Sequence, residues 1–310
     1  MPTLDELGCE IEVRLGRKAD QLRRLGGNLE ERLSFLAAPQ PWLTDEENLR
    51  NEALFGDIAR LINQVISERE LRAVASPVPD WFVRMALGLA RESARLITFN
   101  YDRLLERCLR QEGVVSDLAD LYAIPLAQRQ PAGIGMMLSS NSPKDPDHVP
   151  SLMKLHGSLG WLYGGRTASV SEELFLTSGS RLQWDPSPDQ RMKPPRYDVL
   201  YDHKVPLIIP PTASKSGYYS NLALRAQWRL ASEAIRSAPE LVFIGYSLPA
   251  MDLQARQMIK WSCRGAPHLT VVDPSPDSCR RVEELLHRAV DMHYGEPDAV
   301  KRFVSERWPG

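Results

Sequence analysis

Three polar residues with side chains suited to catalysis follow two short apolar runs of the sequence. Asn100 and Asp102 come just after "RLITF", and His156 follows "LMKL". An amide can orient a substrate, whereas a carboxylate or an imidazole can move a proton near neutral pH. These three residues are therefore the catalytic candidates.

Small and acidic residues follow apolar runs at further places. Gly157 and Ser158 stand next to the histidine, Gly245 and Ser247 follow "ELVFI", and Asp273 follows "HLTVV". Glycine and serine let a ligand approach the backbone, and the start of a following helix offers free N–H groups to a phosphate. An acidic residue can hydrogen-bond a ribose hydroxyl. The set predicts a nucleotide-binding crevice that contains one histidine.

Each of these residues, taken singly, is also common for structural reasons. Asn and Asp cap helices, His-Gly often marks a turn, and an aspartate after a strand can begin a loop. It is their ordered recurrence after apolar runs that indicates a binding site.

The apolar runs themselves predict the elements that position these residues. Beyond residue 94, "RLITF", "LMKLHG", "VPLIIP", "ELVFIG" and "HLTVVDP" have the composition of strands, and most are followed by helical segments. Strands that are apolar throughout and alternate with helices are typical of an α/β fold with a mostly parallel sheet and helices on both faces. In such sheets, ligands bind beyond the carboxyl ends of the strands.

The first part of the chain has a different character. Leu, Ala, Ile, Glu and Arg recur at helical spacing over most of it, although "CEIEVRL" (residues 9–15) fits either a helix or a short strand. We therefore predict a mainly helical N-terminal segment, residues 1–93, and an α/β core, residues 94–310.

The composition argues against several classes of protein. The formal net charge of −2 gives no electrostatic reason to expect a nucleic acid or membrane partner, and no apolar run approaches the roughly 20 residues of a membrane span. The beginning of the sequence has no signal peptide, and the four cysteines form no C-x-x-C pair. We predict a cytoplasmic protein that holds no metal.

Five segments, in order, resemble the bacterial sirtuin-like domain family over roughly residues 94–290: "TFNYDRLLE", "LMKLHGSLGW", "PLIIPPT", "LVFIGYSLPAMD" and "LTVVDPSPD". The resemblance implies a Rossmann-like core that binds NAD. Family members are mostly NAD hydrolases of antiviral defence. It therefore implies that NAD is a substrate, cleaved to nicotinamide and ADP-ribose, and that the chain acts as a homo-oligomer or with a defence-system partner subunit.

The resemblance also implies roles for single residues. Asn100 would hold the nicotinamide ribose or the attacking water, Asp102 would lie near the carboxamide, and His156 would be the general base. Cleavage of the glycosidic bond develops positive charge at the ribose C1′, and nicotinamide leaves as a neutral base, so that a polar amide and a base suffice without a metal.

The remaining candidates would bind the cofactor. By the same resemblance, Gly157 and Ser158 would line it next to the histidine. Gly245 and Ser247 would contact phosphate and ribose, and Asp273 the adenosine side.

Two features of sirtuin-like proteins are missing from the sequence. The zinc-binding cysteines of the deacylases are absent, which argues against protein deacylation. The G-A-G-x-S loop that wraps the pyrophosphate is also absent. Either this loop lies upstream of Met1, or the protein lacks it. The second case predicts a catalytically weak or inactive module that binds NAD or ADP-ribose within a complex.

Overall fold

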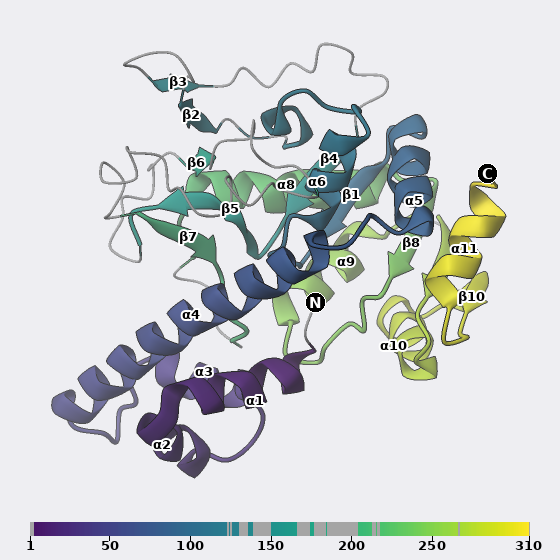
Figure 1. Ribbon diagram of the computed structural model, residues 1–310. Helices are drawn as coiled ribbons and strands as arrows, with labels where there is room; N and C mark the ends of the chain where they lie inside the picture. The colour runs from purple at the N-terminus through teal and green to yellow at the C-terminus, as the bar shows by residue number, and fades with distance from the viewer. Residues whose placement is uncertain are drawn as a thin grey trace.

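The structure is a computed structural model (Figure 1). The described residues are 3–122, 124, 126–129, 136–138, 150–165, 174–176, 184, 204–212, 215, 218–265 and 267–309, with the backbone alone described for 127–129 and 136–138.

The N-terminal segment is helical, as predicted. Its elements are α1 (Leu4–Leu15), η1 (Gly16–Lys18), α2 (Ala19–Arg24), α3 (Leu29–Ala37), α4 (Asp45–Val74) and α5 (Asp80–Arg91). The ambiguous stretch "CEIEVRL" lies inside α1 and is therefore helix, not strand. Helices α1, α3 and α4 each begin with a capping box, in which Thr3, Asn28 or Thr44 accepts the N–H of a glutamate three residues later.

Two parallel sheets follow. One pairs β1 (Arg95–Thr98) with β4 (Ser151–Lys154). The other has the order β10–β9–β8, formed by β8 (Glu240–Ile244), β9 (His268–Val272) and β10 (Met292–Tyr294). The connecting helices are α6 (Leu104–Gln111), η2 (Leu118–Leu121), α8 (Leu222–Ser237), α9 (Leu253–Ser262), α10 (Pro276–Leu286) and α11 (Ala299–Arg307).

This arrangement confirms the predicted fold class, an α/β, Rossmann-like architecture with parallel sheets and a helical N-terminal segment. On strand β8, successive side chains point to opposite layers of helices. Leu241 and Phe243 pack in the cluster that contains Ile259 of α9, whereas Val242 and Ile244 pack in the cluster that contains Phe303 of α11. Helices therefore cover both faces of this sheet.

The prediction that "VPLIIP" adds a strand to the parallel sheet is wrong. Strand β7 (Val205–Ile208) pairs antiparallel with β5 (Gly157–Tyr163) in a separate sheet of order β3–β2–β6–β5–β7. The other members of that sheet are β2 (Ala127–Arg129), β3 (Met136–Leu138) and β6 (Phe175–Leu176). Strand β7 lies at the edge, which fits Pro206, because proline has no N–H to give to a second neighbour.

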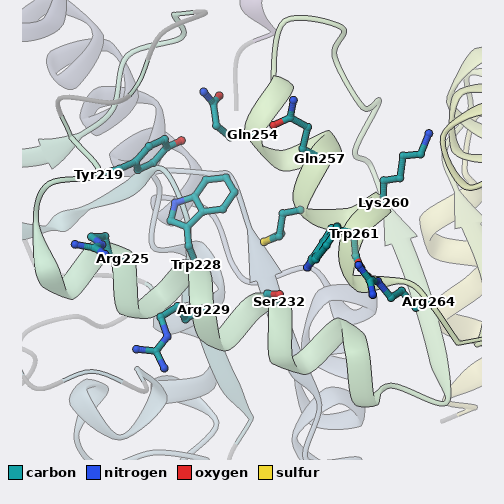
Figure 2. A pocket seen from close by; sticks show the side chains of 11 residues that line it. Tyr219, Arg225, Trp228, Arg229, Ser232, Gln254, Gln257, Lys260, Trp261 and Arg264 are labelled. Atoms are coloured by element: carbon teal, nitrogen blue, oxygen red, sulfur yellow. The ribbon is translucent and has the colours of Figure 1, made fainter.

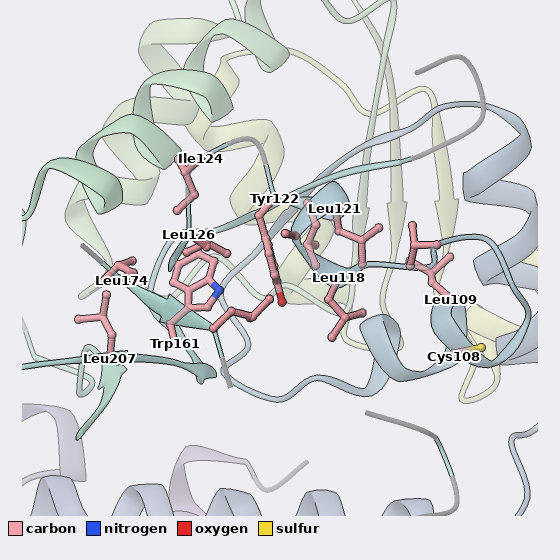
Figure 3. Packing of buried hydrophobic residues seen from close by; sticks show 14 of the residues in the cluster. Cys108, Leu109, Leu118, Leu121, Tyr122, Ile124, Leu126, Trp161, Leu174 and Leu207 are labelled. Atoms are coloured by element: carbon pink, nitrogen blue, oxygen red, sulfur yellow. The ribbon is translucent and has the colours of Figure 1, made fainter. Parts of the chain in front are cut away.

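A large apolar core joins the sheet that contains β5 and β7 to the β1–β4 pair. Trp161 and Leu207 contribute to it from β5 and β7, and Tyr122, Leu121 and Cys108 from the segment that follows β1 (Figure 3). The ring of Tyr122 meets that of Trp161 edge to face, with centroids 5.2 Å apart. This core holds the β4–β5 turn, where His156 lies, in place.

An ion-pair network ties the long helix α4 to the core. Glu70 of α4 is 1% exposed and accepts hydrogen bonds from Arg103 and Arg107, each through Nη2 at 2.8 Å. Burial alone would raise the pKa of Glu70, but the two guanidinium groups hold this pKa at about 2. The N-terminal helices are thus fixed at the point where β1 leads into α6. The boundary at residue 93 stays a prediction.

Among the residues that the structure describes, no helix combines the length and the apolar character needed to cross a membrane. The cytoplasmic location stays a prediction.

We expect Glu70→Gln to lower the free energy of unfolding by about 3 kcal/mol at pH 7, because two buried guanidinium groups lose their counter-charge. The pKa of Glu70 is about 2 in the folded chain against an ordinary 4.5. The carboxylate's contribution to the free energy of unfolding is therefore complete above pH 4.5 and is lost as the pH falls through 2. Urea unfolding of the wild type and of Glu70→Gln across this pH range measures the difference between their free energies of unfolding.

The matched control is Glu46→Gln, which removes an exposed carboxylate from the same helix and should cost less than about 0.5 kcal/mol. A difference between wild type and Glu70→Gln that does not shrink at low pH would contradict the ion-pair account.

Candidate functional site

His156 lies at the centre of a buried cluster of ionisable side chains. Its side chain has a relative exposure of 9%, and Nε2 is 3.2 Å from Nζ of Lys215 and 3.5 Å from Oδ1 of Asp252. Nζ of Lys215 also donates to Oδ1 of Asp252 at 2.8 Å. An imidazole, an ammonium group and a carboxylate from three distant parts of the chain therefore meet at one place.

The backbone around His156 is held by strands on two sides. Leu155 donates its N–H to the carbonyl of Thr98 at 3.0 Å, and the carbonyl of His156 accepts the N–H of Ile209 at 3.0 Å. The indole of Trp228, on α8, donates to the carbonyl of Leu155 at 3.1 Å. The imidazole is thus placed at the carboxyl end of β4 by β1, by the residue that follows β7, and by α8.

The surroundings keep His156 neutral. Burial is the main reason that its pKa lies below the usual 6.5; the nearby carboxylate of Asp252 opposes this lowering, and the charge of Lys215 adds to it. Lysine has only donors, so its contact with Nε2 is a hydrogen bond only while Nε2 is unprotonated. A neutral imidazole can accept a proton near neutral pH.

Asp252 stays ionised in the same cluster. Burial would raise its pKa, but His156 and Lys215 hold the pKa well below its ordinary value. The hydroxyl of Tyr246 donates to Oδ2 of Asp252 at 3.1 Å, so both carboxylate oxygens have partners. This carboxylate is placed to stabilise positive charge that develops nearby.

Aromatic rings surround the imidazole. The ring centroids of Phe99, Tyr101 and Trp228 lie 5.0, 6.5 and 6.4 Å from that of His156. Phe99 stacks on Tyr246 at 4.4 Å. These aromatic side chains lower the local polarity and strengthen every electrostatic interaction within the cluster.

The N-terminal helices contribute a further carboxyl group. Glu30, in the first turn of α3, is 6% exposed. Burial raises its pKa, and Lys215 and Asp252 are close enough to act on it electrostatically. Glu30 cannot be recognised as a site residue from the sequence, because an acidic residue in the first turn of a helix is ordinary.

The other two catalytic candidates lie at the end of β1. Asn100 is exposed, and its N–H donates to Oγ1 of Thr98 at 3.1 Å. Asp102 is buried, and its Oδ1 accepts the N–H of Leu104, the first residue of α6, at 3.1 Å. Burial raises the pKa of Asp102, while Lys154 and this hydrogen bond oppose the rise. The hydrogen bond to Leu104 is a structural reason for an aspartate at position 102, and its role at the carboxamide stays a prediction.

Gly157 and Ser158 both have structural reasons for their identity. Gly157 has φ +85°, and a Cβ there would lie 2.0 Å from the carbonyl oxygen of Leu207. Ser158 is fully buried, and its hydroxyl accepts the N–H of Gly160 at 3.2 Å. Close pairing of β5 with β7 thus requires glycine beside the histidine.

The remaining binding candidates follow β8 and β9. Gly245 has φ +60° with open space around its Cα, and the carbonyl of Ser247 accepts from Arg281 at 2.9 Å. Asp273 is buried and accepts the N–H of Ser275 at 2.8 Å, before α10. Asn100, Asp102 and Gly245 line one common cavity. The binding roles stay predictions.

A separate groove of about 940 Å³ opens between α8 and α9 (Figure 2). It shares Trp228 with the surroundings of His156, and Trp261 and four cationic side chains also line it: Arg225, Arg229, Lys260 and Arg264. None of the site residues expected from the sequence lies in it.

Within the described part of the chain, no group of three or more His, Cys, Asp or Glu side chains is placed to hold a metal ion. The cysteines at 9, 108, 263 and 279 are free thiols.

A comparison with protein families finds a match over the part of the chain that contains the site residues predicted from the sequence. The model of the SIR2-like domain family matches residues 94–290, which is more than half of the sequence. No curated protein matches.

We expect Gly157→Ala to destabilise the fold by at least about 3 kcal/mol, because the methyl group would both strain the backbone and meet the Leu207 carbonyl. Gly113→Ala is the matched control, since Gly113 has φ +71° but nothing within 4 Å of a Cβ. It should cost only about 1–2 kcal/mol. Thermal unfolding of both variants measures the difference; equal costs would show that the contact with Leu207 is unimportant.

We also expect Lys215→Met to raise the pKa of His156, because the ammonium charge lowers it. Titration of the imidazole signals by NMR tests this shift. The same titration of the wild-type chain is the reference. A His156 midpoint that stays unchanged or falls would show that Lys215 does not act on the imidazole.

Proposed function

The chain belongs to the SIR2-like domain family, and we propose that it hydrolyses NAD at the glycosidic bond to nicotinamide, releasing nicotinamide and ADP-ribose. The observation that carries this proposal is the buried, neutral imidazole of His156 beside an ionised carboxylate. These are the groups that a metal-free hydrolysis requires.

The proposed reaction uses the cluster as follows. The bond between C1′ and the nicotinamide nitrogen breaks, and its electron pair leaves with nicotinamide. A water molecule that takes the place of Lys215 at Nε2 of His156 gives its proton to the imidazole, and its oxygen bonds to C1′. Asp252 stabilises the resulting imidazolium and the positive charge on the ribose. The proton then returns to solvent.

Asn100 has a positioning role in this proposal. Its exposed side chain lies at the end of β1, where an amide can hold a ribose hydroxyl or the attacking water. In the cell, such an activity would deplete NAD. We propose that the protein serves as an antiphage effector, as a homo-oligomer or with a partner subunit.

A binding module for NAD or ADP-ribose without turnover is the second candidate. Two observations favour it: the sequence lacks a G-A-G-x-S loop, and Lys215 is within 3.2 Å of the nitrogen that would accept the proton.

Nicotinamide release from NAD by the purified chain separates the two candidates. We expect His156→Ala to lower the rate by about 100-fold or more, and Asn100→Ala and Asp252→Asn to lower it by about 10-fold or more. His268→Ala, which removes an exposed imidazole at the start of β9, should leave the rate unchanged.

Release at the wild-type rate by folded His156→Ala would refute the assigned base. Saturable NAD binding without release by any variant would establish the binding module instead.

A further inference from the structure

The groove between α8 and α9 gathers positive charge (Figure 2). Arg225 and Arg229 stand one turn apart on α8, and Lys260 and Arg264 lie at the last turn of α9 and just beyond it. All four side chains are exposed, and no carboxylate in the described part of the chain forms an ion pair with them. The groove therefore favours an anionic occupant.

The rest of the groove is largely apolar. Trp228, Met258 and Trp261 line it, and Trp261 is 63% exposed. The guanidinium of Arg264 lies over the Trp261 ring, 3.8 Å from its centroid. Tryptophan, methionine and arginine are enriched at protein interfaces, where tryptophan and arginine often supply much of the binding energy. This composition favours a protein segment that carries both carboxylates and apolar side chains.

The start of α4 has the matching composition. Its first turn contains Asp45, Glu46 and Glu47. Two large apolar side chains flank this turn, Trp42 at 70% and Leu49 at 64% exposure. Among the described residues, these carboxylates form one ion pair, between Glu46 and an exposed arginine one turn later, and such a surface pair is weak. Negative charge and exposed apolar surface thus occur together here.

This segment, residues 42–49, which we call the α4 tip, projects away from the core. Helix α4 has 30 residues and is therefore roughly 45 Å long. Near its other end, Glu70 is fixed by Arg103 and Arg107, and Figure 1 shows the beginning of the helix far from α8 and α9. The tip therefore cannot reach the groove of its own chain, but it is free to reach that of another copy.

We propose that the α4 tip of one copy docks in the α8–α9 groove of a second copy. The tip carboxylates face the four cations, and Trp42 and Leu49 pack on the apolar lining that includes Trp261. Each copy carries both surfaces, so the contact is heterologous and repeats until a ring closes or an open chain grows. It uses neither His156 nor Asp252, and it is therefore independent of the proposed hydrolysis.

Charge reversal tests the contact by light scattering over a range of protein concentrations, without any NAD. One variant combines Arg225→Glu with Arg229→Glu, and the other combines Asp45→Lys with Glu46→Lys. In each variant, like charges meet at the contact. We expect the wild type to self-associate, and the dissociation constant of each variant alone to rise by about tenfold or more.

An equimolar mixture of the two variants should associate again, because the acidic groove of one then meets the basic tip of the other. Such a rescue also shows that both variants are folded. The matched control combines Arg91→Glu with Lys301→Glu, which reverses two exposed cations on α5 and α11. Its self-association should equal that of the wild type.

Three results would overturn the proposal. A wild type that stays monomeric at every concentration would show that the two surfaces do not bind each other. Loss of association on reversal of the groove, but not of the tip, would assign the groove to a different acidic segment. Variants that keep the thermal unfolding midpoint of the wild type but do not associate when mixed would show that the two surfaces are not partners.

Discussion

The carboxylate of Asp252 is the charge on which the rest of the site depends. Buried between Lys215 and His156, it joins the segment after β8, the segment after β7 and the β4–β5 turn. A buried charge without a partner would cost several kcal/mol. The three segments must therefore meet for the fold to tolerate any of these groups. Burial keeps the imidazole neutral, and the charge of Lys215, which also pairs with the carboxylate, adds to this effect. Folding and the proposed chemistry therefore share the ion pair between Lys215 and Asp252.

The helical N-terminal segment belongs to the same physical unit as the core. Its apolar cluster contains Leu159 of β5 and Ile208 of β7 together with the inner faces of α1, α3 and α4. Glu70 holds α4 on the loop after β1, and Glu30 adds a carboxyl group beside Asp252. These helices therefore influence the electrostatics of the site as well as the stability of the fold.

Much of the fold could be predicted because its signals are local. Apolar runs and helical spacing were enough for the fold class and for the positions of Asn100 and His156 at strand ends. The meeting of Lys215 and Asp252 with His156 could not be predicted, because it depends on how three distant segments pack. An apolar run also carries no information on the direction in which a strand pairs, so the antiparallel pairing of β7 with β5 cannot be predicted from "VPLIIP". The sequence predicts that Gly157 binds the cofactor, and close contact with β7 is by itself a sufficient reason for glycine there.

The central claim is that NAD binds at the cluster around His156. The most direct measurement is an NMR titration of the purified chain with NAD that follows the imidazole signals of His156 and His268. We expect a saturable shift of the His156 signals, with those of His268 unchanged, whether or not NAD is consumed. Saturable binding of NAD that leaves the His156 signals in place would contradict it.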